Sequence, residues 1–91
     1  MKIPKYEKEM QKTIKSVARL VGKQGFTQST QRSLSQRLDQ SRFQITPQGV
    51  YLRHIKKKMI VTLDDSGHPV YRRYGWQPNY EFPLHLAVYQ A

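Results

Sequence analysis

The stretch Ile45-Thr46-Pro47-Gln48-Gly49-Val50-Tyr51-Leu52-Arg53-His54-Ile55-Lys56 decides how the fold is interpreted. Thr46 followed by Pro47 is typical of a helix start, because threonine can accept hydrogen bonds from the first amides and proline fits the first helical position. The apolar side chains at helical spacing within and just after this stretch are Tyr51, Leu52, Ile55 and Met59. We therefore predict a helix from Pro47 to about Lys58, although Gly49 weakens it by about 1 kcal/mol relative to alanine.

Two further helices are predicted before this stretch. The first covers Tyr6 to Val21 and is followed by Gly22 as a stop signal. Its apolar residues share one helix face and are Tyr6, Met10, Ile14, Val17 and Val21. A second, shorter helix is predicted from Ser29 or Thr30 to Leu38. Residues 39–45 have no clear period and predict a turn, with Phe43 and Ile45 pointing inward.

Strands are predicted toward the C-terminus. Residues 60–63 and 70–74 are rich in β-branched and aromatic side chains, and the polar segment 64–69 between them is a turn, so a β-hairpin is expected. Beyond Gly75 the chain reads as an extended tail. Alternation over residues 84–89 predicts a last strand that covers the domain or pairs with a second chain.

Charge is the most unusual feature of the composition. The 91 residues include 16 Lys and Arg against 6 Asp and Glu, a formal net charge of +10. Such an excess attracts polyanions, and nucleic acid is the expected partner because phosphate neutralisation releases counterions. The chain has no cysteine, which excludes disulfides and thiolate zinc sites. It also lacks an apolar run of the roughly 18 residues needed for a membrane span, and lacks a signal-peptide pattern, so a cytoplasmic location is expected.

The order helix, helix, turn, helix, hairpin resembles a winged helix-turn-helix domain over Leu34 to Trp76. The resemblance implies an α+β fold, with a three-helix domain and β-hairpin wing in residues 1–76 and a tail in residues 77–91. The layout is similar to the N-terminal DNA-binding domain of the arginine repressor. That family's separate arginine-binding and hexamerising domain has no counterpart here, so control by arginine is not implied.

The resemblance implies a DNA-binding surface along the predicted third helix and the wing. Side chains in the major groove would read bases, since arginine pairs bidentately with guanine and glutamine with adenine. The implied base readers are Gln48, Val50, Arg53, His54 and Lys57. Lys56 and Lys58 would neutralise phosphates, and Arg72 or Arg73 would reach an adjacent minor groove or backbone. The alternative is an ordinary solvated helix face beside a hairpin that completes the core.

A basic stripe follows the predicted first helix, about 170° from its apolar stripe at 100° per residue. Its members include Lys8, Lys12, Lys15 and Arg19. The stripe could contact a phosphate backbone, RNA or an anionic membrane surface, or it could be a solvated face.

No arrangement typical of catalysis, metal binding or cofactor binding is visible, because the three histidines lie far apart and the acids are scattered. We therefore expect no enzyme and no cofactor, but a homodimer that binds duplex DNA sequence-specifically as a transcriptional regulator or a plasmid or phage accessory factor. Two alternatives stay open. One is a small basic ribonuclease or translation-targeting toxin in which His54, His68 or His85 acts as acid or base. The other is a module that binds a protein partner through the aromatic tail.

Overall fold

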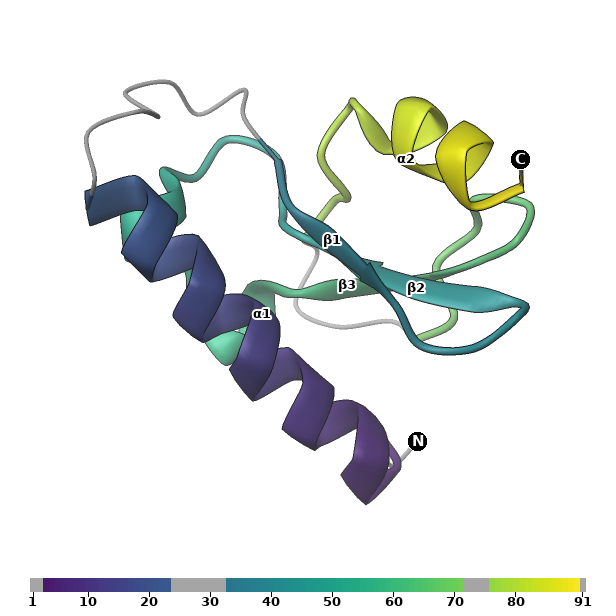
Figure 1. Cartoon of the computed structure of the whole chain (residues 1–91), viewed down its shortest axis with the longest axis horizontal. Helices are drawn as coiled ribbons and strands as arrows, with labels where there is room; N and C mark the ends of the chain where they lie inside the picture. The colour runs from purple at the N-terminus through teal and green to yellow at the C-terminus, as the bar shows by residue number, and fades with distance from the viewer. Residues whose placement is uncertain (1–2, 24–32, 72–75, 91) are drawn as a thin grey trace.

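The computed structural model describes residues 3–23, 33–71 and 76–90. In order, the elements are α1 (Lys5–Lys23), β1 (Ser35–Arg37), β2 (Arg42–Ile45), the 3₁₀ turns η1 (Leu52–His54) and η2 (Lys57–Met59), β3 (Val61–Asp64) and α2 (Phe82–Gln90). Figure 1 shows the three strands lying between the two α-helices. The described part of the chain therefore has an antiparallel sheet as its central layer.

The sheet has the order β1-β2-β3, and its two faces differ in chemistry. Side chains alternate between the faces of a strand, so every second residue shares a side. Phe43 pairs with Leu63 and Ile45 with Val61 across β2 and β3. These four side chains form an apolar cluster on which Phe82, Leu86, Tyr89 and Trp76 pack. The apolar face of the sheet is thus covered by α2 and the segment before it.

The opposite face of the sheet is polar and lies against α1. Gln36 pairs with Gln44 in the strand register, and the Gln36 carboxamide donates to Gln44 Oε1 at 3.0 Å. Gln44 Nε2 donates to the backbone oxygen of Glu7 in α1 at 3.0 Å, and Gln36 Nε2 donates to that of Met10. Backbone carbonyls of α1 therefore satisfy the amide side chains of the sheet, as buried polar groups require.

The polar sheet face changes which side of α1 is buried. Glu7 and Gln11 are buried, as are Ile14 and Ala18 farther along the helix. Tyr6 and Val17, which belong to the predicted apolar stripe, keep 55% and 46% of their surface exposed. The Glu7 carboxylate forms an ion pair with Arg42 at the start of β2. The predicted helix is confirmed, but its buried face is rotated by about one residue from the predicted apolar stripe because a polar surface lies opposite it.

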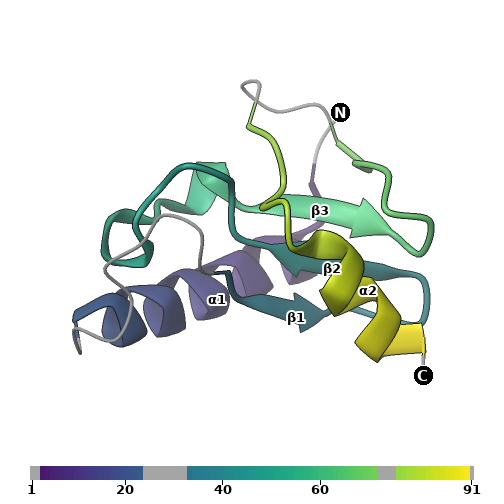
Figure 2. The ribbon, with the colours of Figure 1, turned by 90° about the horizontal axis from the view of Figure 1, so that it is seen from above.

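A second apolar cluster joins the C-terminal half of α1 to the segment with the two 3₁₀ turns. Its buried members are Ile14, Ala18, Leu52, Ile55 and Ile60. Gly22 allows this close approach, since a Cβ there would lie 2.4 Å from the backbone nitrogen of Arg53. Figure 2 shows this segment next to α1 at the end of the sheet away from α2.

The predicted helix from Pro47 to Lys58 is wrong. Pro47 forms an isolated antiparallel bridge with Pro78, and Gly49 has a φ of +82°, outside the right-handed helical region. Only the short turns η1 and η2 are helical in this stretch, and the residues that flank them are extended. Leu52 and Ile55 are buried as their spacing predicted, but single 3₁₀ turns bring them to the same side of the chain.

The predicted second helix, which was to end at Leu38, and the predicted turn at residues 39–45 are also contradicted. The described end of the predicted second helix contains β1, while residues 24–32 lie outside the described residues. The predicted turn at residues 39–45 contains β2, although Phe43 and Ile45 are buried as expected. These polar residues form strands because β1 and β2 pair with each other in register, from Ser35 opposite Ile45 to Arg37 opposite Phe43.

The C-terminal half combines confirmed and contradicted predictions. Residues 61–64 form the strand β3, and the Asp64 side chain accepts hydrogen bonds from the amides of Ser66 and His68 in the predicted turn. The strand partner of β3 is β2 and not the predicted second hairpin strand at residues 70–74. After the turn, Pro69 forms an isolated bridge with Leu63, and the Val70 amide donates to the Thr62 carbonyl. Residues 72–75 lie outside the described residues. The predicted last strand over 84–89 is wrong, because these residues lie in α2. The three-helix winged fold is also wrong, because β1 and the two 3₁₀ turns stand where its second and third helices were predicted.

Thr46 connects the strands to the segment that precedes α2. It is fully buried, and its backbone N–H donates to the Leu34 carbonyl at 3.0 Å. Its hydroxyl accepts from the Leu34 amide at 3.1 Å, and its carbonyl accepts from the Asn79 amide at 3.0 Å. One residue thereby sets the positions of the entry to β1 and the entry to α2.

Substitution of Thr46 by valine tests this connection. The change preserves shape but leaves the buried Leu34 amide without its acceptor, which should lower the free energy of unfolding by about 1–3 kcal/mol. Thr62→Val is the matched control, because the buried Thr62 hydroxyl has no hydrogen-bond partner among the described residues. Chemical denaturation should show a loss for the first variant and little change or a gain for the second. Equal losses would contradict the role of Thr46.

Candidate active site

A row of polar side chains runs along α2 and faces a second row on β1. Glu81, His85 and Tyr89 are spaced by four residues, which places them on one helix face. Ser33 and Ser35 are spaced by two residues at the entry to β1, which places them on one face of an extended chain. The polar side chains of the helix row therefore face the two serines at the entry to β1.

The contacts between the two rows are short and continuous. Ser33 Oγ donates to Glu81 Oε1 at 2.7 Å and also lies 2.8 Å from His85 Nε2. Ser35 Oγ lies 2.6 Å from His85 Nδ1 and 2.5 Å from the Tyr89 hydroxyl. Both ring nitrogens of His85 are therefore bound by serine hydroxyls of the neighbouring chain segment.

The segment before α2 holds Glu81 in place. The Asn79 carboxamide oxygen accepts a hydrogen bond from the Glu81 amide at 2.9 Å, and the Asn79 carbonyl accepts from the Phe82 amide at 2.9 Å. Asparagine in this position caps the first amides of a helix. Because Asn79 is itself bonded to Thr46, the carboxylate of Glu81 and the serines of β1 are held relative to each other by one buried residue.

Burial sets the electrostatics of the histidine. It lowers the pKa of His85 from its ordinary value, and the negative charge of Glu81 opposes this effect only in part. The neutral imidazole is therefore the favoured form near neutral pH, with one ring nitrogen that donates and one that accepts.

The other acidic side chains of the described residues are either paired with basic residues or lie at the turn after β3. Glu7 is buried with Arg42, and Glu9 lies 3.7 Å from Lys12 on the exposed side of α1. Bonds from the Ser41 amide and from Arg42 lower the pKa of Asp39 to about 2. Asp64 ends β3 and accepts hydrogen bonds from backbone amides of the following turn, in which Asp65 is exposed. Among the acids of the described residues, Glu81 is thus the one that is partly buried and accepts a hydrogen bond from a serine hydroxyl.

Two open pockets lie beside this row of residues. One has a volume of about 530 Å³ and is lined by Gln48, Trp76, Gln77, Pro78, Tyr80 and Phe82, which include both chain neighbours of Glu81. The other, of about 190 Å³, is lined by His85 and Tyr89 together with Leu84 and Val88. A small molecule can therefore contact His85 and Tyr89 in the second pocket, whereas the first pocket is lined by the chain neighbours of Glu81 and not by Glu81 itself.

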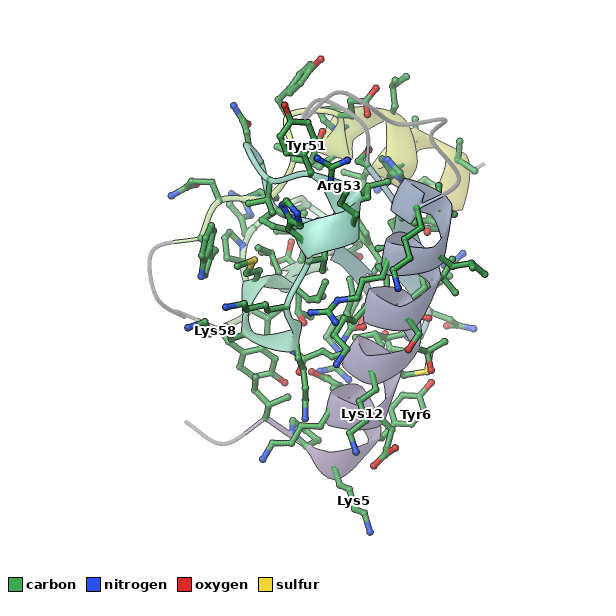
Figure 3. All side chains as sticks on the ribbon, turned by 90° about the vertical axis from the view of Figure 1, so that its left-hand side faces the viewer. Lys5, Tyr6, Lys12, Tyr51, Arg53 and Lys58 are labelled. Carbon is green, nitrogen blue, oxygen red and sulfur yellow. The ribbon has the colours of Figure 1, made fainter. Side chains whose placement is uncertain are left out.

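The residues implied as DNA contacts do not share one helix. Figure 3 shows that Lys12 comes from α1, whereas Arg53 and Lys58 come from the segment with the 3₁₀ turns. In that segment Val50 packs against the core, and Arg53 lies over the Tyr51 ring at 5.3 Å. Gln48, His54 and Lys56 are exposed, and Lys57 is partly buried. Arg72 and Arg73 lie outside the described residues.

The side chains of the predicted basic stripe lie along α1. Lys8, Lys12 and Arg19 are exposed and Lys15 is partly buried. Arg19 Nε donates to the Ile55 carbonyl at 2.9 Å, so this arginine fastens α1 to the end of η1. Within the described ranges, no group of three or more His, Cys, Asp or Glu could hold a metal ion. No helix of these ranges is long and apolar enough to cross a membrane.

Comparison with known proteins identifies the fold. The family model of the class II aldolase and adducin N-terminal domain matches residues 12–91. The chain belongs to this family. A comparison of this sequence with curated protein sequences found no match.

Solved structures agree with this assignment. YgbL from Escherichia coli, a candidate aldolase/epimerase/decarboxylase, has a TM-score of 0.83 and 20% identity over 94% of this chain and 40% of its own. L-fuculose 1-phosphate aldolase from Glaciozyma antarctica PI12 has a TM-score of 0.77 and 14% identity over 99% of this chain and 39% of its own. Another L-fuculose 1-phosphate aldolase has a TM-score of 0.66 and 25% identity over 87% of this chain and 39% of its own. The class II aldolase/adducin domain thus spans about 40% of the length of these structures.

The family contradicts the predicted function. The winged helix resemblance, the sequence-specific DNA-binding regulator and the ribonuclease or toxin alternative are all wrong, and so is the expectation of a non-enzyme with a nucleic-acid partner. The physical cause is the loss of the predicted third helix, on which the proposed base readers depended. Its residues form 3₁₀ turns that pack on α1 instead of a helix that could enter a major groove.

Sequence reasoning missed Ser33, Ser35 and Glu81, and named His85 only in the ribonuclease alternative. One signal was present, because Glu81, His85 and Tyr89 repeat at a spacing of four residues. This spacing is typical of one helix face, but the same segment alternates apolar side chains like a strand. The serines gave no signal of their own, since their partners lie about 50 residues away.

The lowered pKa of His85 predicts a pH-dependent contribution to stability. Folding favours the neutral ring, so its contribution is complete above the ordinary pKa of 6.5 and is lost as the pH falls through the lower folded-state value. The difference in unfolding free energy between the parent chain and His85→Gln should be larger at pH 7.5 than at pH 5.5. His68→Gln, in the exposed turn, is the control. A difference that is flat or grows toward pH 5.5 would contradict this assignment.

Proposed function

We propose that this chain contributes the proton-transfer group of an aldolase-type active site and that Glu81 is this group. The observation that supports it is the partly buried Glu81 carboxylate, held by Ser33 Oγ at 2.7 Å between two residues that line an open pocket. Membership of the class II aldolase and adducin N-terminal domain family agrees with this chemistry. The fold neighbours described as L-fuculose 1-phosphate aldolases suggest a phosphorylated ketose as the class of substrate.

Aldol chemistry needs a base of this kind. In the condensation direction, a carboxylate takes a proton from the carbon next to a ketone, and the C–H electron pair becomes part of an enediolate. The enediolate carbon then forms the new bond to an aldehyde, whose oxygen takes the proton that the carboxyl group removed from carbon. In the cleavage direction the carboxylate takes the hydroxyl proton of the ketose as the carbon–carbon bond breaks, and the protonated carboxyl then gives that proton to the enediolate carbon. A positioned carboxylate in such a step typically contributes about 10²–10⁴-fold to the rate.

The pocket beside Glu81 suits a small hydroxylated molecule. Gln48 and Gln77 bring carboxamides that can donate to and accept from hydroxyl groups, and Trp76 and Tyr80 bring aromatic rings. Sites for small ligands typically combine apolar walls with a few polar groups that fix orientation. We assign only the proton transfer and part of the substrate contact to this chain, because it spans about 40% of the length of its fold neighbours. A cytoplasmic location and a homodimer remain predictions.

The half-reaction can be measured without the second substrate. Dihydroxyacetone phosphate is incubated in D₂O with the protein that carries this chain, and proton NMR follows exchange at the carbon next to the ketone. Glu81→Gln should lower the exchange rate by about 10²-fold or more, since the amide cannot take the proton. Glu9→Gln, which changes an exposed acid on α1, should leave the rate unchanged.

Unphosphorylated dihydroxyacetone tests the substrate class in the same experiment, and should exchange more slowly than the phosphate ester. Absence of exchange in the parent protein, or an equal rate in Glu81→Gln, would contradict the proposed function. Equal rates with the two ketones would contradict the phosphorylated substrate class while leaving the role of Glu81 intact.

A further inference from the structure

Five side chains of the candidate site are linked end to end by hydrogen bonds. We call them the relay, in the order Tyr89, Ser35, His85, Ser33 and Glu81. The four successive contacts measure 2.5, 2.6, 2.8 and 2.7 Å. None of the four includes a backbone atom, so the direction of each bond depends only on where the side-chain hydrogens lie.

The Glu81 end of the relay fixes the tautomer of the histidine. The Ser33 hydroxyl has a single hydrogen, and this hydrogen is donated to Glu81 Oε1. The same hydroxyl oxygen must then accept in its contact with His85. The hydrogen of the neutral imidazole therefore lies on Nε2.

The directions of the hydrogen bonds made by Ser35 and Tyr89 follow from the number of hydrogens on each group. With its hydrogen on Nε2, the neutral ring has Nδ1 as an acceptor, so Ser35 donates to it. Ser35 has then used its only hydrogen, and Tyr89 must donate to Ser35. Every hydrogen of the relay points toward Glu81.

The far end of the relay is fixed to β1. Arg37 donates from its guanidinium to the Tyr89 carbonyl at 2.9 Å, and the same guanidinium lies 5.9 Å from the centre of the Tyr89 ring. The Tyr89 ring also contacts Phe43 of the apolar sheet face at 5.2 Å between centroids. The phenol that starts the relay is therefore held by both polar and apolar contacts.

We propose that Ser33, His85, Ser35 and Tyr89 are positioning residues that act through this oriented relay to direct the Glu81 carboxylate, an inference that rests on the proposed function. A hydroxyl that can only donate to Oε1 keeps that oxygen an acceptor and assigns the substrate proton to Oε2. Protonation of His85 places a second hydrogen on Nδ1, which forces Ser35 to turn and reverses the bond to Tyr89. The charged and titratable groups that face the ring in the described chain are Glu81 and Tyr89, with Arg37 behind Tyr89.

The tautomer is measured directly and without any enzyme assay. Long-range ¹H–¹⁵N correlation spectra of the ¹⁵N-histidine-labelled chain at pH 7.5 should show His85 with a protonated Nε2 and an unprotonated Nδ1. Ser33→Ala removes the acceptor for Nε2–H and should move the ring toward a mixture of tautomers, while Ser33→Thr should restore the parent spectrum. Ser16→Ala, on the exposed side of α1, is the control for a serine change and should leave the His85 signals unchanged. A parent ring protonated on Nδ1, or in equal exchange between tautomers, would overturn the relay.

The exchange assay with dihydroxyacetone phosphate separates positioning from a merely structural role. Ser33→Ala should lower kcat by about 10-fold or more with KM changed less than about twofold, because the carboxylate loses its alignment while the substrate pocket is intact. Ser33→Thr should recover most of the rate. If Glu81→Gln abolishes exchange but Ser33→Ala leaves kcat unchanged, the positioning role is overturned and the proposed function stands. If the Nε2–H tautomer is found but the parent shows no exchange, the proposed function fails, and the catalytic role of the relay fails with it.

Discussion

The arrangement of this domain depends on the hydrogen bonds of Thr46. Its side chain and backbone bond to both polar backbone groups of Leu34, and its carbonyl binds the Asn79 amide. Leu34 lies between the two serines of the relay, and Asn79 caps the turn that carries Glu81. Because buried backbone groups cannot be left without partners at low cost, these bonds tie β1, β2 and the start of α2 into one unit. The short distances between Ser33 and Glu81 are a consequence of this connection.

The second constraint is the difference between the two faces of the sheet. An apolar face packs α2, and a face of glutamine and threonine side chains packs α1. Two carbonyls of α1 accept hydrogen bonds from the glutamine side chains of this face, whereas the Thr62 hydroxyl and the Gln11 carboxamide are buried without a hydrogen-bond partner among the described residues. The polar face also explains the buried Glu7, whose charge is compensated by Arg42. Burying such a pair contributes little net stability, but losing one partner would leave an uncompensated charge in the core.

The polar row of the candidate active site lies at the margin of the apolar face. Phe82, Leu86 and Tyr89 of α2 pack against the sheet, while Glu81 and His85 point toward the serines at the entry to β1. The helix is thereby fixed by apolar contacts on one side and by the relay on another. Rigid elements of this kind are the supports on which side chains can be held to the precision that proton transfer requires. The opposite side of α2 leaves Leu84 and Val88 largely exposed.

Local sequence determined α1, the strand β3 and the Asp64 turn, because helical spacing, β-branched residues and an Asx turn act within a few residues. It did not determine the segment after Thr46, where threonine followed by proline suits a helix cap and an extended bridge equally well. There the tertiary structure decided, since Thr46 uses its hydrogen-bonding groups on Leu34 and Asn79 instead of on a following helix. The same holds for α2, whose apolar residues fit both a strand and a helix. For the candidate site, the spacing of Glu81, His85 and Tyr89 was present in the sequence, but the serines that bind them come from a strand about 50 residues away. Only packing of α2 on the sheet brings these groups within hydrogen-bonding distance.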